Sequence, residues 1–417
     1  MKSNLYLFNP TCELAVANGS SNFMAPAKLR RFEDELSALP GILAQPNDIV
    51  IVDRQPSQQF SDQLESAGFL VPLYRTMENL YSDPSSMTED LGFLLPWGWS
   101  PSAHKLLQPF KSACSSAFLN SPVAEWREIH RDLYSRRSSL DILTGIITNS
   151  NLCDALTLND LPIICTNHDD IIRLQQKWGK VVVKAPWSAS GRGLQVLRSN
   201  EYNQTNRQVI SGILKQQGYV VVGPWHNKVL DLSFQFFSFG NGSVEYKGLT
   251  SFSTDLAGHY ISNFIQEFPP DLIPEIEAFL KQNIPDIKNA LQNTLTKSDY
   301  ALYYYGWFGV DAMIFRSDQG DLKFHPCLEI NCRFTMGAIA LSLRNHMAEY
   351  SNGEFRLTHG KNGDFFEFCR EMTKKEPLIL DDERIVAGFL PLTPVLPDCS
   401  FGAYLRAKRK NEISRNK

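Results

Sequence analysis

Short apolar segments alternate with segments of helical pattern over the first 100 residues of the chain. We predict strands at residues 5–9, 48–53, 69–74 and 93–97, and helices at residues 28–39 and 60–67. Strands separated by helices are typical of βαβ units, in which the strands form a parallel sheet. Ligands of such sheets bind beyond the carboxyl ends of the strands. The turn-rich segments 9–18 and 96–104, which follow two of these strands, are therefore expected to contribute to a site.

A second domain is expected to begin around residues 124–147, where apolar side chains recur at helical spacing about a basic middle. We interpret this segment as a hinge, and Ser135 or Ser138 is predicted to interrupt its helix. Beyond it we predict strands at residues 180–185, 218–223, 232–239, 244–248, 303–315 and 322–330, and a helix at residues 273–295 that Pro285 breaks. Two more strands are predicted at residues 384–390 and 401–406.

Composition limits the classes of protein that the chain can belong to. Its 417 residues are 43% hydrophobic and carry a net charge of −4, which suits two or three globular domains rather than a disordered chain or a nucleic-acid binder. The eight cysteines are scattered, without a Cys-x-x-Cys pair, as in reduced cytoplasmic proteins. Residues 1–19 are too polar for a secretion signal, and the apolar segment 301–315 is too short to span a membrane. We expect a cytoplasmic protein without a nucleic-acid or membrane partner.

A lysine, Lys184, ends one of the predicted apolar strands and precedes a loop of small residues, Ser188-Ala-Ser-Gly-Arg-Gly193. A positive charge beside exposed backbone N–H groups can bind a polyphosphate. The loop is neither a Walker motif nor a complete Gly-x-Gly-x-x-Gly, so a flexible hairpin loop after a strand-end lysine is the alternative.

Two carboxylates interrupt the apolar strands near residue 320. Asp311 lies within Gly306-Trp-Phe-Gly-Val-Asp311, and Glu329 begins the pattern Glu-x-Asn-x-Arg that ends at Arg333. Side chains two apart on a strand share a face, so Glu329, Asn331 and Arg333 are expected to project together. An unpaired buried carboxylate is costly, and oxygen ligands of this kind suit Mg²⁺. A buried salt bridge between Glu329 and Arg333 is the alternative interpretation.

The order of these motifs along the chain resembles the ATP-grasp superfamily over about residues 125–340. The segment Tyr219-Val-Val-Val-Gly-Pro-Trp225 resembles the connection between the two halves of that family's nucleotide site. The resemblance implies an α/β (α+β) protein with a Rossmann-like pre-ATP-grasp domain followed by a two-lobed ATP-grasp domain. The domains would span residues 1–123 and 124–360, with lobes at 124–217 and 218–360. Residues 361–417 would form a C-terminal extension with short strands and a basic tail.

The resemblance also implies which residues bind ATP. The α- and β-phosphates would be held by Lys184 and, through backbone donors, by Ser190, Gly191 and Gly193. Adenine would be framed by Val222, Gly223 and Trp225, and the ribose would be held by Asp231. The acid that the family usually has at this connection is missing here. A second basic group enters from the hinge in that family, and Arg137 is our candidate, although a lysine is more usual there.

The metal ligands and phosphoryl-transfer groups follow from the same resemblance. Asp311, Glu329 and Asn331 would bind two Mg²⁺ ions, for which Mn²⁺ could substitute. Arg333 would stabilise the transferring phosphoryl group or an anionic intermediate, and Lys247 could reach the γ-phosphate. The acceptor site is less determined. The polar segment 249–263 is too long for a simple hairpin, and its candidates are Asp255, His259, Tyr260 and Asn263.

Together these features predict an ATP- and Mg²⁺-dependent ligase that activates a carboxylate of a small molecule or peptide as an acylphosphate. An amine would then attack, releasing phosphate and leaving an amide. An ATP-grasp phosphotransferase that acts on a hydroxyl and a non-catalytic nucleotide-binding module are the alternatives. The expected partners are ATP and the small-molecule or peptide substrates, and a homo-oligomer is compatible with the sequence.

Overall fold

The computed structural model describes residues 2–82, 91–188, 193–198, 202–255 and 258–410. Its leading part contains a parallel four-stranded sheet with the strand order β3-β2-β1-β4. The strands are β1 (Ser3–Leu7), β2 (Ile49–Ile51), β3 (Leu73–Arg75) and β4 (Leu91–Pro96). Around them lie α1 (Cys12–Asn18), α2 (Ala27–Glu35), α3 (Gln58–Ser66), α4 (Met77–Ser82), α5 (Pro101–Leu107) and α6 (Ser116–Leu119). The parallel sheet predicted from the alternation is confirmed.

Two helices, α7 (Glu128–Leu133) and α8 (Arg136–Asn149), follow this sheet. Ser135 separates them because its side chain accepts a hydrogen bond from the backbone N–H of Ser138 and caps α8. The predicted interruption is therefore confirmed at Ser135.

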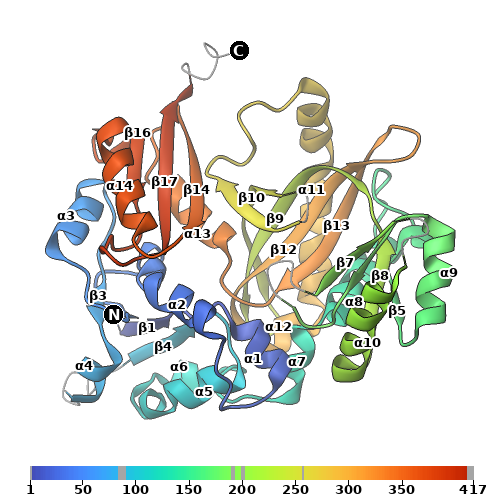
Figure 1. The fold of residues 1–417 in the computed structure, drawn as a ribbon, viewed down its shortest axis with the longest axis horizontal. Coiled ribbons are helices and arrows are strands. Elements are labelled where there is room, and N and C mark those ends of the chain that lie inside the picture. Colours follow the sequence, from blue (N-terminus) through green and yellow to red (C-terminus); the bar gives the residue numbers. More distant parts are fainter. Residues whose placement is uncertain (1, 83–90, 189–192, 199–201, 256–257, 411–417) are drawn as a thin grey trace.

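A small antiparallel sheet comes next, with the order β5-β8-β6-β7. Its strands are β5 (Ile163–Cys165), β6 (Val181–Lys184), β7 (Leu194–Leu197) and β8 (Val220–Pro224), and its helices are α9 (His168–Trp178) and α10 (Gln204–Gln217). Buried side chains such as Ile171, Val183 and Ile210 give this unit its own small core. In Figure 1 it stands at one end of the molecule, beside the large sheet.

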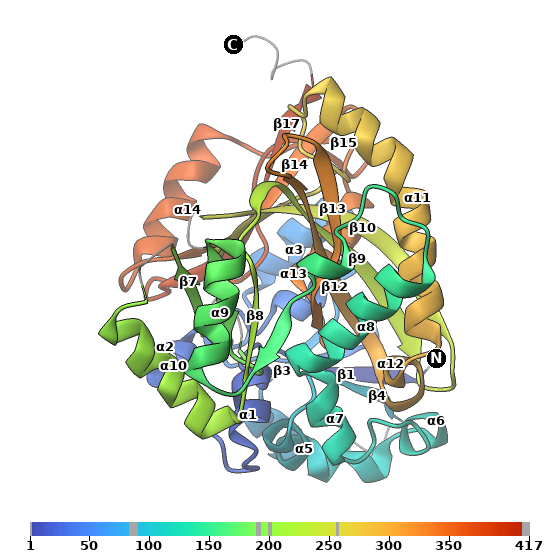
Figure 2. The same cartoon turned by 90° about the vertical axis from the view of Figure 1, so that its right-hand side faces the viewer.

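The large sheet has nine strands in the order β13-β12-β9-β10-β11-β14-β17-β16-β15. Its first five along the chain are β9 (Asn227–Phe239), β10 (Val244–Thr254), β11 (Tyr260–Phe264), β12 (Tyr305–Arg316) and β13 (Leu322–Asn331). Helices α8, α11 (Pro274–Thr296) and α12 (Asp299–Tyr303) pack on one face, and α13 (Met336–Arg344) packs on the other. Figure 2 shows α8 and α11 side by side.

The C-terminal strands β14 (Ser351–His359), β15 (Ile379–Asp381), β16 (Arg384–Pro391) and β17 (Phe401–Arg409) continue the same sheet. Helix α14 (Asp364–Lys375) packs against β16 and β14. Among the described residues, no helix is long and apolar enough to cross a membrane. All eight cysteines are free, and all but Cys153 are buried.

Two sequence expectations are wrong. The segment 249–263 is a β-hairpin, because β10 extends to Thr254 and pairs in antiparallel register with β11. Helix α11 runs through Pro285 without ending there. Pro285 is exposed, so water can solvate the carbonyl group that loses its amide partner. β14, α13 and α14 were not predicted.

Candidate active site

Two cavities lie on either side of Glu329, where β13 meets the small sheet and the hinge. The first cavity is walled mainly by apolar side chains, and its polar or small members are Arg136, Ser139, Lys184, Gly223, His226, His325 and Cys327. The second cavity is lined by the acidic residues Asp311 and Glu329, with Asn331 and Arg333 beside them. An ion pair joins the two, because the Arg136 guanidinium Nη1 lies 2.7 Å from Glu329 Oε2.

Arg136 is held rigidly at the start of α8. Its Nε donates to the carbonyl of Ala185 at 3.0 Å, and its Nη2 donates to Ser188 Oγ at 3.1 Å. The backbone N–H of Arg136 donates to the carbonyl of Pro186. The first residue of the helix is therefore tied to the strand and loop that carry Lys184, and its charge is fixed between the two cavities.

Lys184 lies at the end of β6, where it lines the first cavity. Burial and the neighbouring Arg136 charge lower the pKa of Lys184 to about 8, against the opposing pull of Glu329 and Asp311. Two cations therefore crowd one cleft, which is the arrangement expected where a polyanion binds. The loop after Lys184 ends at Gly193, whose backbone carbonyl accepts a hydrogen bond from the backbone N–H of Ala185. The φ angle of Gly193 is +75°, a conformation that favours glycine.

Asp311 and Glu329 are directly opposite each other on β12 and β13. The register slips beside them, because the three residues of β12 from Asp311 to Met313 face the five residues of β13 from His325 to Glu329. Pro326 lies in this bulge, where its missing N–H removes no ladder bond. Burial and the negative charge of Glu329 raise the pKa of Asp311 to about 6. Paired carboxylates of this kind call for a cation.

A chain of hydrogen bonds orients Asp311. Its Oδ1 accepts from Ser233 Oγ and its Oδ2 accepts from Asn331 Nδ2, both at 2.8 Å. Ser233 Oγ in turn accepts from Gln235 Nε2, and Gln235 Oε1 accepts from Thr335 Oγ1 at 2.6 Å. Gln235 is fully buried, so both ends of its amide are fixed in orientation.

Arg333 connects this site to the leading part of the molecule. Its Nη2 donates to Asn331 Oδ1 at 2.9 Å, and its Nε lies 3.2 Å from Glu13 Oε1 on α1. Burial raises the pKa of Glu13, an effect that the Arg333 charge opposes. A side chain at Gly98 would collide with Cys12 Sγ at 2.4 Å and approach Arg333 Cβ at 3.0 Å. Glycine at this position therefore allows β4, α1 and Arg333 to meet.

The residues fit a magnesium ion. Asp311, Glu329 and Asn331 offer hard oxygen ligands on one wall, and the only cation paired with Glu329 among the described contacts is Arg136. No three His, Cys, Asp or Glu side chains of the described residues form a cluster that could hold a metal ion, and the third oxygen donor at this site is the amide of Asn331.

Of the other residues predicted to bind the nucleotide, some line the first cavity and others do not. Gly223 lines the first cavity, whereas the Val222 side chain is buried in the small core. Trp225 does not line that cavity, and the Lys180 ammonium lies over its ring. The Asp231 carboxylate accepts hydrogen bonds from Lys228 and Thr254. Ser190 and Gly191 are outside the described residues.

Two predicted cations lie away from both cavities. Arg137 is exposed, with its guanidinium 4.9 Å from the centre of the Tyr219 ring. Its neighbour Arg136 does line the first cavity, because the first residue of α8 faces the cavity and the second is exposed. Lys247 pairs with Glu245 at 2.8 Å and lies over Phe237, lining neither cavity.

The acceptor candidates divide into two groups. Tyr260 and Asn263 line the second cavity, and the Tyr260 hydroxyl donates to Asn263 Oδ1 at 2.8 Å. Asp255 and His259 pair with each other at the tip of the hairpin, and His259 lines a third cavity that adjoins the second.

Several residues of the site were missed from the sequence. Arg136 and Glu13 were overlooked in favour of neighbouring residues, and Ser233 and Gln235 lie in a strand that otherwise looks like core. The sequence did indicate Ser233 and Gln235, because these polar residues alternate with phenylalanines along the strand. His226 and His325 line the first cavity, where burial lowers the pKa of His226 to about 4 and that of His325 well below its usual value.

The sequence matches no protein-family model and no curated protein. Solved structures do resemble it in fold. One is N5-carboxyaminoimidazole synthetase from Staphylococcus aureus, complexed with ADP, which superposes with a TM-score of 0.51 at 12% identity. The superposition covers 100% of this chain and 96% of the synthetase. The biotin carboxylase domain of 2-oxoglutarate carboxylase from Hydrogenobacter thermophilus, in complex with MgADP and bicarbonate, superposes with a TM-score of 0.51 at 11% identity, covering 97% of this chain and 85% of that one.

Biotin carboxylase from Campylobacter jejuni gives a TM-score of 0.51 at 12% identity, covering 99% of this chain and 89% of its own. At such identities the likeness concerns the fold. The chain has the ATP-grasp fold, and the fold class expected from its motifs is confirmed.

Proposed function

We propose that this protein is an ATP- and Mg²⁺-dependent ligase that joins a carboxylate to an amine. The observation that carries the proposal is that two cations, Lys184 and Arg136, line one cavity and two carboxylates, Asp311 and Glu329, line the next, with Arg136 and Glu329 paired at 2.7 Å between them. Cations suit phosphate oxygens and carboxylates suit the metal ion that accompanies them. Neighbours of the same fold were solved with ADP or MgADP, which supports a nucleotide in this cleft.

In this proposal each residue has a positioning or electrostatic role. The apolar walls of the first cavity take the base, with the Gly223 backbone beside it. Lys184 and Arg136 bind phosphate oxygens, and Asp311, Glu329 and Asn331 hold Mg²⁺, which neutralises phosphate charge when bound. Arg333, fixed by Glu13 and Asn331, binds the reacting carboxylate or the transferring phosphoryl group.

The chemistry needs no nucleophilic side chain. A carboxylate oxygen of the substrate attacks the γ-phosphorus, and ADP leaves. An amine then attacks the carbonyl carbon of the acylphosphate, phosphate leaves, and an amide remains. The protein aligns the reactants and excludes water from the acylphosphate.

The test is a screen for release of ADP and phosphate from ATP with paired acids and amines, in the presence of Mg²⁺. Lys184→Ala is the inactive control. Hydroxylamine in place of the amine should give a hydroxamate, because it intercepts an acylphosphate. A stable phosphoester would instead identify a phosphotransferase that acts on a hydroxyl, and ATP binding without any turnover would identify a non-catalytic module.

A further inference from the structure

The second cavity adjoins a third one, and the two share the lining residues Pro10, Phe32, Tyr260 and Leu357. The third cavity lies between α1 and α2 of the leading part and the strands β14 and β17. It holds about 1100 Å³ of space that no protein atom fills, part of it open to solvent. A ligand that reacts beside Asp311 and Arg333 can therefore extend into it.

The walls of the third cavity are mainly apolar. Leu14, Leu29 and Phe32 come from the two helices, and Leu357 and Phe401 come from the facing strands. None of these five side chains is among the freely exposed large apolar residues of the described chain, so they are shielded within a concave surface. Large shielded apolar surfaces beside a few polar groups mark small-molecule pockets.

Most polar side chains of this cavity have hydrogen-bond partners or are exposed to solvent. Thr11 donates to Glu33, Tyr260 donates to Asn263, and His259 pairs with Asp255. Lys28 and His359 are exposed. No described residue that lines the cavity is acidic, so the cavity offers no carboxylate partner for the ammonium group of an amine substrate.

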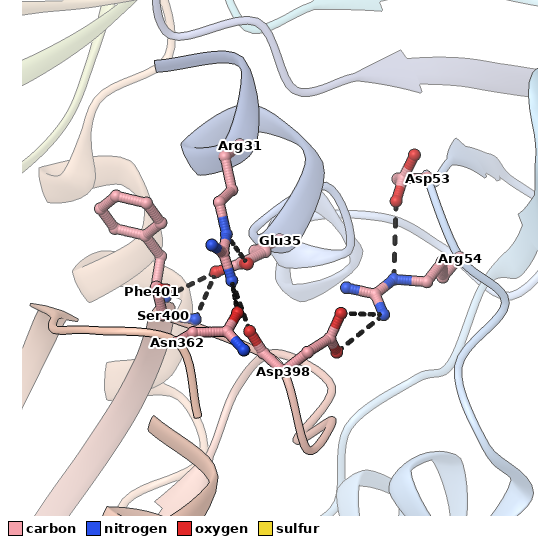
Figure 3. Close-up of polar contacts among 8 residues, drawn as sticks. All are labelled: Arg31, Glu35, Asp53, Arg54, Asn362, Asp398, Ser400 and Phe401. Atoms are coloured by element: carbon pink, nitrogen blue, oxygen red, sulfur yellow. Dashed lines mark hydrogen bonds and ion pairs between the residues drawn. The ribbon is translucent and has the colours of Figure 1, made fainter. Parts of the chain in front are cut away.

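A set of polar contacts, which we call the clamp, joins α2 to the segment 398–401, and Figure 3 shows these contacts. The Glu35 carboxylate accepts the backbone N–H groups of Ser400 and Phe401 at 2.7 and 2.6 Å. Arg31 pairs with Glu35 and donates to the backbone carbonyl of Asp398. Helix α2, which carries Phe32, is thus tied to the start of β17, which carries Phe401, and their rings meet edge to face at 5.3 Å.

We infer that the third cavity selects the acid substrate, and that this substrate is a carboxylic acid bearing a bulky apolar group, such as an aromatic or branched aliphatic one. The inference rests on the proposed function, because it places the reacting carboxylate at Asp311 and Arg333. A phosphate group or a second carboxylate on the substrate would lose its hydration against the five apolar side chains of this cavity. Such an acid would therefore bind more weakly.

The test measures binding of four acids by isothermal titration to the protein saturated with Mg·ADP. We expect 3-phenylpropionate and 4-methylpentanoate to bind at least about tenfold more tightly than succinate and 3-phosphoglycerate, as expected for burial of a large apolar group. Leu29 lines the third cavity but not the second, so Leu29→Asp should weaken binding of the apolar acids about tenfold or more without changing the Kd of Mg·ADP. Leu158→Asp, at an exposed leucine far along the chain, is the matched control.

The outcomes separate this inference from the proposed function. Tighter binding of succinate or 3-phosphoglycerate, absence of binding by both apolar acids, or equal effects of Leu29→Asp and Leu158→Asp would overturn the inference. If Mg·ADP fails to bind, the proposed function fails, and titration of the same acids into the protein alone still decides whether the cavity prefers apolar ones. A Glu35→Gln variant adds a second check, because loosening the clamp should weaken the apolar acids and spare Mg·ADP.

Discussion

Two consecutive arginines open α8, and only Arg136 points into the cleft. Arg137 is exposed and stacks on Tyr219, so the pair provides its own matched control. We expect Arg136→Ala to weaken Mg·ATP binding about 10- to 100-fold, because one charge-assisted contact to phosphate is lost. Arg137→Ala should stay within about twofold of wild type. Isothermal titration measures both, and equal effects of the two variants would show that the hinge cation is wrongly identified.

Buried histidines make the protein sensitive to acid. Burial and the Lys111 charge lower the pKa of His104 to about 3, and both of its ring nitrogens lack a hydrogen-bond partner. Burial lowers the pKa of His130 to about 4. Below pH 6.5 the unfolded chain binds protons at these histidines that the folded chain does not bind. Stability is therefore complete above that pH and is lost as the pH falls toward these lowered pKa values.

We expect His104→Phe to lose less stability than wild type on acidification. The difference between pH 7 and pH 5 should reach about 2 kcal/mol, because each pH unit below 6.5 costs about 1.4 kcal/mol per buried neutral histidine. Urea unfolding at the two pH values measures it. An identical acid-induced loss in the variant and in wild type would mean that His104 takes up a proton in the folded state.

At the scale of elements, the central strand β9 supports the acidic pair through Ser233 and Gln235. We expect Gln235→Leu to lower the affinity for Mn²⁺ about tenfold, because Ser233 loses the donor that orients it toward Asp311. It should also destabilise the fold by about 1–3 kcal/mol, since Thr335 is left without its acceptor. Electron paramagnetic resonance of free Mn²⁺ reports the affinity and thermal unfolding reports the stability.

Thr335→Val serves as the control for this prediction. It removes the donor to Gln235 Oε1 but leaves Gln235 Nε2 to orient Ser233, so stability should fall while Mn²⁺ affinity stays within about twofold of wild type. Unchanged Mn²⁺ affinity in Gln235→Leu would show that β9 does not orient the acidic pair.

The periodicity of the sequence correctly predicted the strand that carries Glu329, but it failed for the hairpin at 249–263 and for helix α13. The spacing of Glu329, Asn331 and Arg333 predicted that they project together, and all three line the second cavity. Segment 249–263 was misread because its polar residues resemble a loop, although Ser253 and Ser262 pair across a hairpin. Helix α13 was missed because its small apolar residues, between Met336 and Arg344, show no amphipathic alternation.

For the whole molecule, the contacts that close the site join residues far apart in the chain. Arg333 meets Glu13, and Phe401 meets the Glu35 carboxylate. A sequence pattern indicates which face of an element is apolar, but it does not determine which distant element will cover that face. The order of the motifs predicted the ATP-grasp fold, whereas the third cavity depends on how the leading sheet docks on the C-terminal strands.

The central claim is that the cleft binds Mg·ATP between Lys184 and the Asp311–Glu329 pair. Isothermal titration of ATP with and without Mg²⁺, into wild type and Glu329→Gln, tests it most directly, with the unfolding temperature confirming that the variant folds. The account predicts Mg²⁺-dependent binding by wild type and at least about a tenfold weaker affinity in Glu329→Gln. Equal affinity of the two proteins for Mg·ATP, or no binding by wild type, would contradict it.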